Sequence, residues 1–579
     1  MQQDQTMNIV ASSEQIPMEE SKPKKKVKVT DQLKGPSLPL QSYAGPLPTL
    51  LLDNGGWTIK HALLKPNPTS DTAKILPTLS QNLSAKPKHQ LTTLFSSQIN
   101  SIHNKSQLVI SRPLERGYIV DLGTQFQIWD YILELENLNP KHSFSNYTTV
   151  TAKDLVKPTA SKRSSPIHDG LTFTHTSAVF LLMQPFTPRC IIEKEDECWF
   201  RDFGFARVGR RLGACCSAYK YLQDGKTASL EGSEYEDDDT GCCLVVDCGF
   251  SMTSIVPTVH AQAIEKGIKR INIGGKLLTN LLKQIISYRK FNMMDEFFLV
   301  NDAKEALSFV SMNFDHEMKD ARGKREGQRW FDRDFVLPNF VDTFTGSVRL
   351  PSELIREKKI EENQGKDEKE AKIEEDNRNE ENVADNQEDD GANDDDENDD
   401  DSDEETEEQA KRRILKQRQE EQKRRELEEM ERQVLSVSTE RFTVPEILFR
   451  PSDIGIEYSG IAEAIVQSIH ACDPIYRAAL YQNIVLTGGT MKIPNLKERL
   501  QQELRSLAPT NYKVRIYLPN DPVEYAWSGA YSLINNNDFV GNVFLDRSEW
   551  ETSKNKKLNT GVIWSTRLNQ GMDSGFTVV

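Results

Sequence analysis

Two short segments, roughly two hundred residues apart, carry the same pattern of apolar and polar positions. Residues 50–60 read as an apolar run that ends at Asp53, a turn containing Gly55, and a second partly apolar run. Residues 244–253 repeat this order around Asp247 and Gly249. An apolar run that stops at a glycine turn and then resumes is typical of a buried strand entering a hairpin. The pattern therefore predicts two β-hairpins of the same design.

The pair of hairpins indicates a phosphate-binding clamp. Glycine lets backbone N–H groups approach an anion closely, and an aspartate can hold a hydrated Mg²⁺. One copy would more often be an ordinary hairpin turn, but two copies favour the clamp. A third apolar strand at 484–486 leads into Gly488 and Gly489. This double glycine suits a backbone that passes close beneath a nucleotide and opens a helix.

With these segments and the runs at 270–279 and 301–305, the chain resembles the actin family, a relative of the sugar kinases and heat-shock chaperones. The resemblance is dense at 303–318 and 440–533, and it covers roughly residues 46–563 apart from one long insertion. It implies an α/β, actin-like two-domain fold, in which duplicated ribonuclease-H-like (actin ATPase) domains are hinged over a nucleotide cleft. We also expect the insertion to be acidic and disordered.

The domain boundaries follow from this resemblance and from changes in composition. They are a polar tail at 1–44, a first domain at 45–240 with a small lobe near 75–113, a second domain at 241–350 and 438–523, an insertion at 351–437, and a C-terminal segment at 524–579 that returns to the first domain.

The net charge of −16 belongs to the insertion rather than to the folded part. Residues 374–408 carry 21 acidic residues and one basic residue, so the rest of the chain is slightly basic. Residues 411–432 have mixed charge, with glutamate and arginine four positions apart, and predict a solvent-exposed helix. The acidic run is open to two interpretations: a polyanion that competes with DNA for histones, or a tolerated loop.

Other features bear on location and redox state. The lysines at 24–28 resemble a nuclear-import signal, although a solvated basic tail is the alternative. No apolar stretch of membrane-spanning length or signal-peptide type is present, so we expect a protein made in the cytosol, without a membrane partner, that enters the nucleus. The eight cysteines lack zinc-type spacing and are predicted to be buried, reduced thiols. The nine histidines are scattered and suggest no metal.

The resemblance assigns a nucleotide site. Positions that match the metal, phosphate and adenine contacts of the family are Asp53, Gly55, Lys60, Asp247, Gly249, Gly275, Lys304, Glu305, Gly488, Gly489 and Thr490. Asp53 and Asp247 would hold Mg²⁺ through water molecules. The implied cofactor is ATP or ADP with Mg²⁺ in a structural role, and the alternative is a degenerate pocket that binds nothing.

Three departures from actin argue against hydrolysis. Trp57 replaces a glycine of the first phosphate turn, and Phe250 replaces an aspartate of the second, so each ring is expected to crowd the phosphates. Glu197 aligns with the glutamine that orients the attacking water. A carboxylate about 5 Å from the terminal phosphate would cost roughly 3 kcal/mol at an effective dielectric near 20, or about two powers of ten in rate. We therefore expect no catalytic residues.

The runs at 270–280, 285–289 and 334–340 look like a nuclear branch of the family rather than actin itself. That resemblance implies a scaffold subunit of an SWR-type chromatin-remodelling complex, which exchanges the ordinary second histone of the nucleosome for its Z-type variant. The implied partners are other subunits and, weakly or indirectly, the histones and DNA of the nucleosome, with no homopolymer. Arg207, Arg210 and Arg211, expected in a helix, are candidate phosphate contacts, against the alternative of solvated charges.

Two other function classes stay open. One is an enzyme, either a polymerising actin-like ATPase or a phosphotransferase of the sugar-kinase kind, which Trp57, Phe250 and Glu197 disfavour. The other is a nuclear actin-related subunit of an INO-type remodeller, which shares the scaffold role but not the partners.

Overall fold

The computed structural model describes residues 47–65, 75–88, 92–102, 105, 108–138, 177–230, 241–289, 292–325, 327–340, 343–351, 434–535 and 543–555. The predictions for the N-terminal tail, the acidic run and the charged helix lie outside these residues. Among the helices within the described ranges, none has the length and apolar character needed to cross a bilayer.

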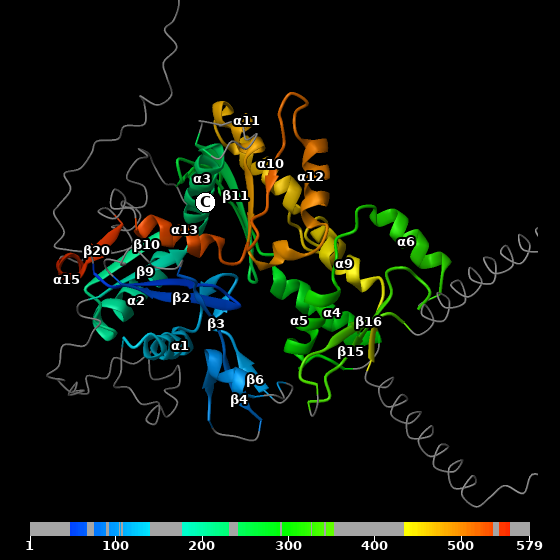
Figure 1. Ribbon diagram of the computed structural model, residues 1–579, viewed down its shortest axis with the longest axis horizontal. Coiled ribbons are helices and arrows are strands. Elements are labelled where there is room, and N and C mark those ends of the chain that lie inside the picture. The colour runs from blue at the N-terminus through cyan, green and yellow to red at the C-terminus, as the bar shows by residue number, and fades with distance from the viewer. Residues whose placement is uncertain are drawn as a thin grey trace, which may run out of the picture.

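The first predicted hairpin lies at the centre of a six-stranded mixed sheet (Figure 1). Its first strand pairs in parallel with β9 on one edge and in antiparallel fashion with β2 on the other. Its leucines at 50–52 are buried in hydrophobic cores on both faces of the sheet, as expected for a central strand of apolar residues. In sheet order the strands are β20 (Phe544–Asp546), β10 (Arg207–Leu212), β9 (Ala178–Met183), β1 (Thr49–Asn54), β2 (Thr58–Leu64) and β3 (Thr78–Gln81). The helices that accompany this sheet in the first domain are α1 (Leu122–Leu135), α2 (Arg189–Asp196), α3 (Gly213–Leu230) and α15 (Arg547–Asn555).

A small lobe follows β3 in the chain and lies at the bottom of Figure 1. Its three-stranded sheet has the order β5 (Leu94–Phe95), β4 (Ser84–Pro87) and β6 (Leu108–Ser111), and a 3₁₀-helix covers Ser96–Ser101. A two-stranded hairpin, β7 (Leu114–Glu115) and β8 (Tyr118–Ile119), leads from the lobe to α1. The core of the lobe includes Phe298 of the second domain, so the two domains are in contact here.

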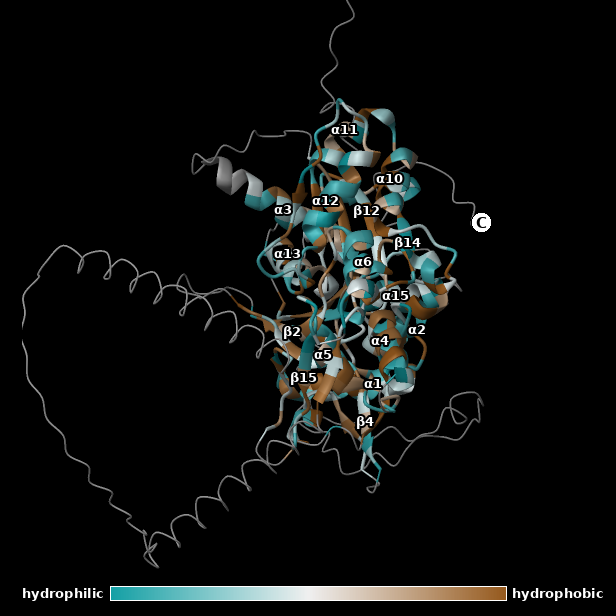
Figure 2. Cartoon of the chain, turned by 90° about the vertical axis from the view of Figure 1, so that its right-hand side faces the viewer, coloured by the Kyte–Doolittle hydropathy of each residue, from teal (hydrophilic) through white to brown (hydrophobic). Residues whose placement is uncertain are grey.

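The second predicted hairpin occupies the matching place in the second sheet, where β11 pairs in parallel with β18 and in antiparallel fashion with β12. The strand order is β13 (Gln262–Ala263), β12 (Thr253–Val259), β11 (Cys242–Cys248), β18 (Ile484–Thr487) and β19 (Ile516–Tyr517), with β14 (Lys269–Ile271) also paired to β12. Figure 2 shows hydrophobic ribbon near β12 and more hydrophilic helices around it. This sheet and its helices contain the largest hydrophobic core. The predicted actin-like α/β fold is therefore confirmed.

Helices and a third sheet complete the second domain. The helices are α4 (Gly275–Arg289), α5 (Phe297–Leu307), α6 (Phe314–Gly323), α9 (Glu440–Glu446), α10 (Ile461–Ala471), α11 (Pro474–Gln482) and α12 (Leu496–Leu507). The third sheet has the order β16 (Ser347–Arg349), β15 (Arg333–Val336) and β17 (Val434–Val437). Both ends of the insertion thus join strands that pair with β15, because Val336 lies opposite Ser347 on one side and Val434 on the other.

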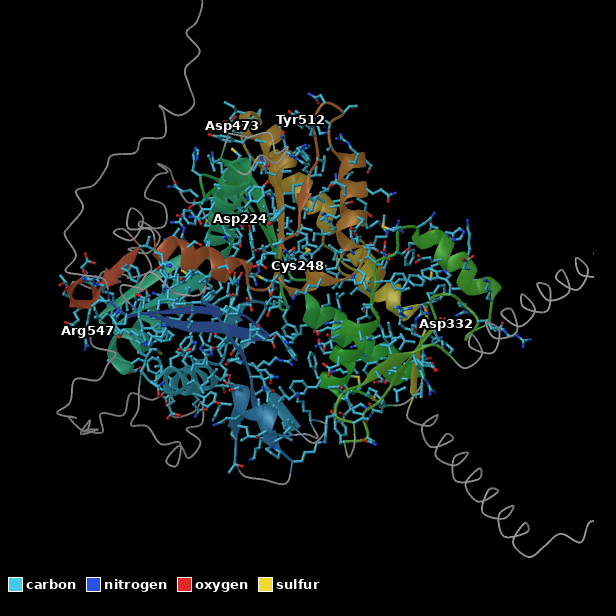
Figure 3. The ribbon with its side chains drawn as sticks, in the orientation of Figure 1. Asp224, Cys248, Asp332, Asp473, Tyr512 and Arg547 are labelled. Carbon is cyan, nitrogen blue, oxygen red and sulfur yellow. The ribbon has the colours of Figure 1, made fainter. Side chains whose placement is uncertain are left out.

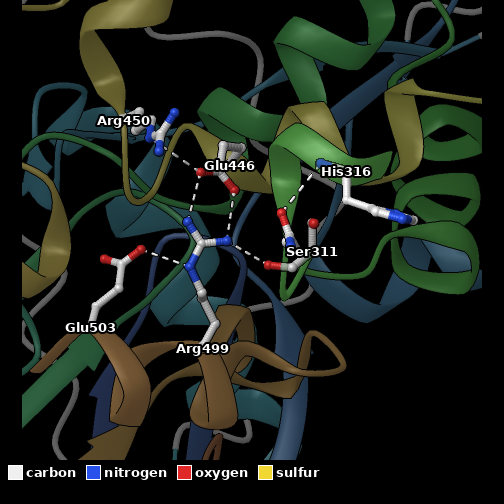
Figure 4. A network of polar contacts seen from close by, with 7 residues as sticks. Ser311, His316, Glu446, Arg450, Arg499 and Glu503 are labelled. Carbon is white, nitrogen blue, oxygen red and sulfur yellow. Dashed lines mark hydrogen bonds and ion pairs between the residues drawn. The ribbon is translucent and has the colours of Figure 1, made fainter. Parts of the chain in front are cut away.

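A buried arginine joins α12 to α9, the helix that follows β17 (Figure 4). Arg499 of α12 donates to Glu446 of α9 at 3.0 Å, to Glu503 at 2.7 Å and to the Ser311 carbonyl. Burial raises the pKa of Glu446, although the charge of Arg499 opposes this shift. The network fixes α9, the first helix after the insertion, on the body of the domain.

The two sheets share a third core that contains α3 and α13 (Tyr525–Ile534). These helices approach closely at Gly529, where an added Cβ would lie 2.0 Å from the Cys216 carbonyl oxygen. Trp527 of α13 is 1% exposed and its indole N–H points to the Leu51 carbonyl of β1. The chain segment after α13 then returns to the first sheet, because β20 pairs with β10.

The cysteine prediction is confirmed for seven of the eight thiols. All eight are free, seven are buried, and Cys190 is exposed. Burial raises the pKa of Cys216 and Cys243 to about 12, so these thiols stay protonated and behave as apolar side chains. Figure 3 shows Cys248 at the end of β11, near the centre of the molecule.

We predict that Trp527→Ala lowers the free energy of unfolding by about 3–5 kcal/mol, because a large buried ring is lost from the core shared by both sheets. Trp330→Ala is the matched control, since this ring is 52% exposed and should cost much less. Urea denaturation followed by circular dichroism measures both. Equal midpoints for the two variants would contradict the prediction.

Candidate functional site

The two hairpin turns face each other across a cavity of about 490 Å³ that also receives the end of β18. This volume is within the range of small-molecule sites. All eleven positions assigned from the sequence line it, from both domains: Asp53, Gly55, Lys60, Asp247, Gly249, Gly275, Lys304, Glu305, Gly488, Gly489 and Thr490. The fold therefore brings together residues that are spread over more than four hundred positions of the chain.

The first turn is held by side chains on either side of it. Lys60 Nζ donates to Asp53 Oδ2 at 2.7 Å, and both side chains are about nine-tenths buried. Asn82 Nδ2 donates to the Gly55 carbonyl at 2.8 Å and to Asn54 Oδ1 at 3.2 Å. An added Cβ on Gly55 would lie 2.6 Å from the Thr58 carbonyl oxygen, so only glycine fits this turn.

The second turn is anchored to the start of α4 and to the 3₁₀-helix after β18. The Gly249 carbonyl accepts from the Gly275 N–H at 3.1 Å and from Thr490 Oγ1 at 2.9 Å. The Lys276 N–H donates to the Phe250 carbonyl at 2.8 Å. These bonds use N–H groups at the start of α4, which would otherwise lack partners within the helix. They fix the second turn against the helix.

The double glycine after β18 permits a close backbone approach. Gly488 has φ +93°, a conformation that L side chains rarely adopt. An added Cβ there would lie 2.3 Å from the Cys248 carbonyl oxygen and 2.8 Å from Asp247 Oδ1. A side chain at this position would therefore displace the end of β11.

The two aspartates differ in their electrostatic environment. Lys60 is paired with Asp53, whereas burial, together with the charge of Asp53, raises the pKa of Asp247 from 3.8 to about 6. On the second-domain side, burial lowers the pKa of Lys304 from 10.5 to about 8. Its ammonium donates to Asn301 Oδ1 at 2.9 Å and to Thr279 Oγ1 at 3.0 Å. The cavity thus contains a carboxylate and a lysine whose charged forms are both disfavoured by burial.

The residues present fit a nucleotide with a divalent cation. Asp247 would be relieved of its desolvation cost by a cation, and glycines at three turns leave room for phosphate oxygens near the backbone. Such a group would supply positive charge beside the carboxylates and a link between the domains. Within the described residues no three His, Cys, Asp or Glu side chains come together, so protein ligands alone do not form a metal cage.

The expected position of Glu197 is wrong. Glu197 lies in a π-helical turn, outside the residues that line the cavity, and accepts from Lys194 and Lys554 at 3.0 Å each. The alignment of Glu197 with the water-orienting glutamine therefore does not match its position in the fold. The cavity is instead lined by Gln184, directly after β9, and by Gly213 at the start of α3. Gln184 follows an apolar run, the same signal that located Asp53 and Asp247.

The expected helix containing Arg207, Arg210 and Arg211 is also wrong. These residues form β10, and Arg210 is fully buried, where it contacts Asp196 and lies 3.1 Å from Glu195. Arg207 pairs with Asp546 at 2.8 Å, and Arg211 donates to the Ala261 carbonyl at 2.8 Å. All three arginines therefore make contacts within the protein itself and are not solvated helix charges.

An α/β protein with two domains and a pair of Asp–Gly turns facing one cavity belongs to the class of actin-type nucleotide-site folds. The sequence profile of the actin family matches residues 47–558, and the chain belongs to the actin family. The resemblance seen in the sequence is thereby confirmed.

Several relatives carry the same name. The chain is 30% identical to actin-related protein 6 of Arabidopsis thaliana over 87% of this chain and 96% of that protein. It is 31% identical to actin-related protein 6 of Dictyostelium discoideum, over 87% and 94% respectively. The protein of the same name from Drosophila melanogaster is 28% identical, over 85% and 94%. The similarity therefore extends over nearly the whole length of these relatives.

We predict that Asp247→Asn stabilises the ligand-free protein at pH 7.5. The folded-state pKa lies above the ordinary value, so ionisation of the carboxyl group costs stability that is lost progressively as the pH rises from about 4 to about 6, and the full cost is present above about 6. A difference of about two pKa units corresponds to roughly 3 kcal/mol. The melting temperature of the variant should exceed that of the wild type at pH 7.5, and the difference should be smaller at pH 4.5. Asp453→Asn, at an exposed position, is the control.

We predict that Arg210→Ala destabilises the fold by about 3–5 kcal/mol, because it leaves buried carboxylates without their cation. Arg207→Ala removes a partly exposed pair and should cost less than about 1 kcal/mol. Thermal denaturation compares the two variants. A mild effect of Arg210→Ala would show that the first domain does not depend on this buried pair.

Proposed function

We propose that this protein is a non-catalytic, actin-related scaffold subunit of an SWR-type ATP-dependent chromatin-remodelling complex, acting in the nucleus. In this role it docks other subunits, and a separate motor hydrolyses ATP while the ordinary second histone is exchanged for the Z-type variant. The proposal rests chiefly on one observation: the chain is similar to proteins named actin-related protein 6 over nearly their whole length. The nuclear-branch resemblance of the sequence supports the same assignment.

The turns of the cavity support a structural rather than a catalytic role. Trp57 lies in the first turn and Phe250 in the second, and their ring centroids are 5.1 Å apart. Phe250 supplies no oxygen for a metal's water shell. A bound nucleotide would then act mainly as a ligand that stabilises the folded state.

One observation keeps an ATPase as the second candidate function. All eleven positions taken from the family's nucleotide site line a single cavity, together with the amide of Gln184. The two candidates separate in a simple assay. The purified chain with Mg²⁺ and ATP should show no steady phosphate release and no pelleting as a polymer, whereas turnover of actin-like speed would favour the enzyme.

Purification of the native complex tests the scaffold assignment. A tagged full-length chain should copurify with the subunits of an SWR-type remodeller, including its motor ATPase, in near-equal amounts by quantitative mass spectrometry. Recovery of an INO-type set of subunits would reassign the protein. Recovery of the chain alone, as a monomer or polymer, would refute the proposal.

We predict that assembly survives replacement of residues 361–433 by a short Gly/Ser linker. The strands at either end of the insertion, β16 and β17, flank β15, and strands in a sheet lie about 4.8 Å apart, so the gap is only about 10 Å. A flexible linker of a dozen residues spans that distance. Copurification with the complex is the readout, and Trp527→Ala is the control that should lower recovery. Loss of assembly in the linker variant alone would make the insertion a docking element.

A further inference from the structure

Five side chains form a cluster that crosses the cleft beside the cavity, and we call it the aromatic clasp: Trp57, Arg112, Phe250, Phe297 and Phe298. Trp57 and Arg112 come from the first domain, the former from the β1–β2 turn and the latter from the residue after β6 of the small lobe. The other three come from the second domain, at the β11–β12 turn and the start of α5. The clasp therefore joins the two domains through two segments on each side of the cleft.

The rings of the clasp are in direct contact. The centroid of Trp57 lies 5.1 Å from that of Phe250 and 5.9 Å from each of Phe297 and Phe298. Phe250 and Phe297 meet edge to face at 6.1 Å. These separations are those of favourable aromatic pairs. Trp57 and Phe298 also pack in the hydrophobic core of the small lobe, so the ring contacts continue into that core.

The guanidinium of Arg112 lies against three of these rings. Its guanidinium carbon is 4.0 Å from the centroid of Phe297 and 5.0 Å from those of Trp57 and Phe250. Its Nε and Nη2 atoms are buried without a hydrogen-bond partner among the described residues. Burial lowers its pKa only to about 10, so it stays charged at neutral pH. The cation is held by ring faces, which attract it most strongly where water is excluded.

Further contacts bring the same two surfaces together next to the clasp. Lys276 of α4 pairs with Glu115 of β7, and the Arg270 guanidinium lies 4.0 Å from the ring of Tyr118. Gly117 has φ +79°, and a Cβ there would lie 3.1 Å from Met252 Sδ. The two turns themselves touch, since a Cβ on Gly56 would lie 2.1 Å from Ser251 Oγ. The closed arrangement is thus packed along a continuous strip.

We propose that the aromatic clasp holds the cleft closed on the small-lobe side without any nucleotide. Every contact of the clasp is made by the chain's own side chains, so closure does not wait for a ligand that bridges the two turns. A ligand shifts the equilibrium between an open and a closed cleft only if it binds one of the two states more tightly. If the ligand-free protein is already almost entirely closed, nucleotide binding can change the closed population only slightly. The cleft is therefore a fixed structural feature and not a nucleotide switch.

Hydrogen exchange of the full-length protein, followed by mass spectrometry, tests this inference. Segments 84–87, 108–111 and 297–307 carry the facing surfaces. In the wild type their exchange rates should differ by less than twofold with and without 1 mM Mg–ATP. In Trp57→Gly and in Arg112→Ala the same segments should exchange at least tenfold faster without ligand, because the closed state has lost its bridging contacts. Trp57→Phe should stay within threefold of the wild type.

Exchange in α12 distinguishes local opening from global destabilisation, because this helix lies away from the clasp and should be unchanged in all variants. The inference is overturned if Mg–ATP slows exchange of the three wild-type segments tenfold or more, since nucleotide would then be what closes the cleft. It is also overturned if both clasp variants exchange like the wild type. The comparisons of ligand-free Trp57→Gly and Arg112→Ala with the ligand-free wild type test the inference even if the chain binds no nucleotide.

Discussion

The close approach of α3 and α13 is the constraint on which the rest of the structure depends. These helices form the core shared by both sheets, and Gly529 lets the backbone of α13 come against the Cys216 carbonyl. A larger residue would force the helices apart. Since β1 and β11 pack on the same core, their separation would change as well. The spacing of the two hairpin turns, and so the width of the cavity, is set here.

When the two turns lie opposite each other, an aspartate from each of them is removed from water, and this burial costs free energy unless a cation offsets it. Burial of Asp53 is offset by Lys60, which lies on the neighbouring strand in the register position directly opposite. Asp247 has Ser254 in the equivalent position, and the charge of Lys60 offsets its burial only in part. The same hairpin design therefore gives one carboxylate, Asp53, that is paired with a lysine, and another, Asp247, whose charged form is disfavoured. Such an asymmetry is expected where polar groups are retained for a ligand rather than for stability.

The sequence predicted those features that depend on local pattern. Apolar runs that lead into a glycine turn located three strands, because a buried central strand and a tight turn impose their composition locally, whereas the eleven cavity residues were assigned from the resemblance to the actin family. Features that depend on distant partners were missed. Arg210 looks solvated in sequence, yet Asp196 and Glu195 make its burial in a strand possible. Glu197 lies outside the cavity, in a π-helical turn, and its partners Lys194 and Lys554 include one that is more than three hundred positions away in the chain.

Trp57 and Phe250 stand where the family has a glycine and an aspartate, and their rings meet each other across the cleft. Trp57 and Phe250 were expected to crowd the phosphates, but the cavity keeps about 490 Å³ while both rings line it. Their other faces contact Arg112 and Phe297, which belong to opposite domains. A glycine and an aspartate at these positions would coordinate a ligand but could not pack across the cleft. Replacing them exchanges side chains suited to a bound ligand for contacts within the chain, and these contacts join the two domains on this side of the cleft.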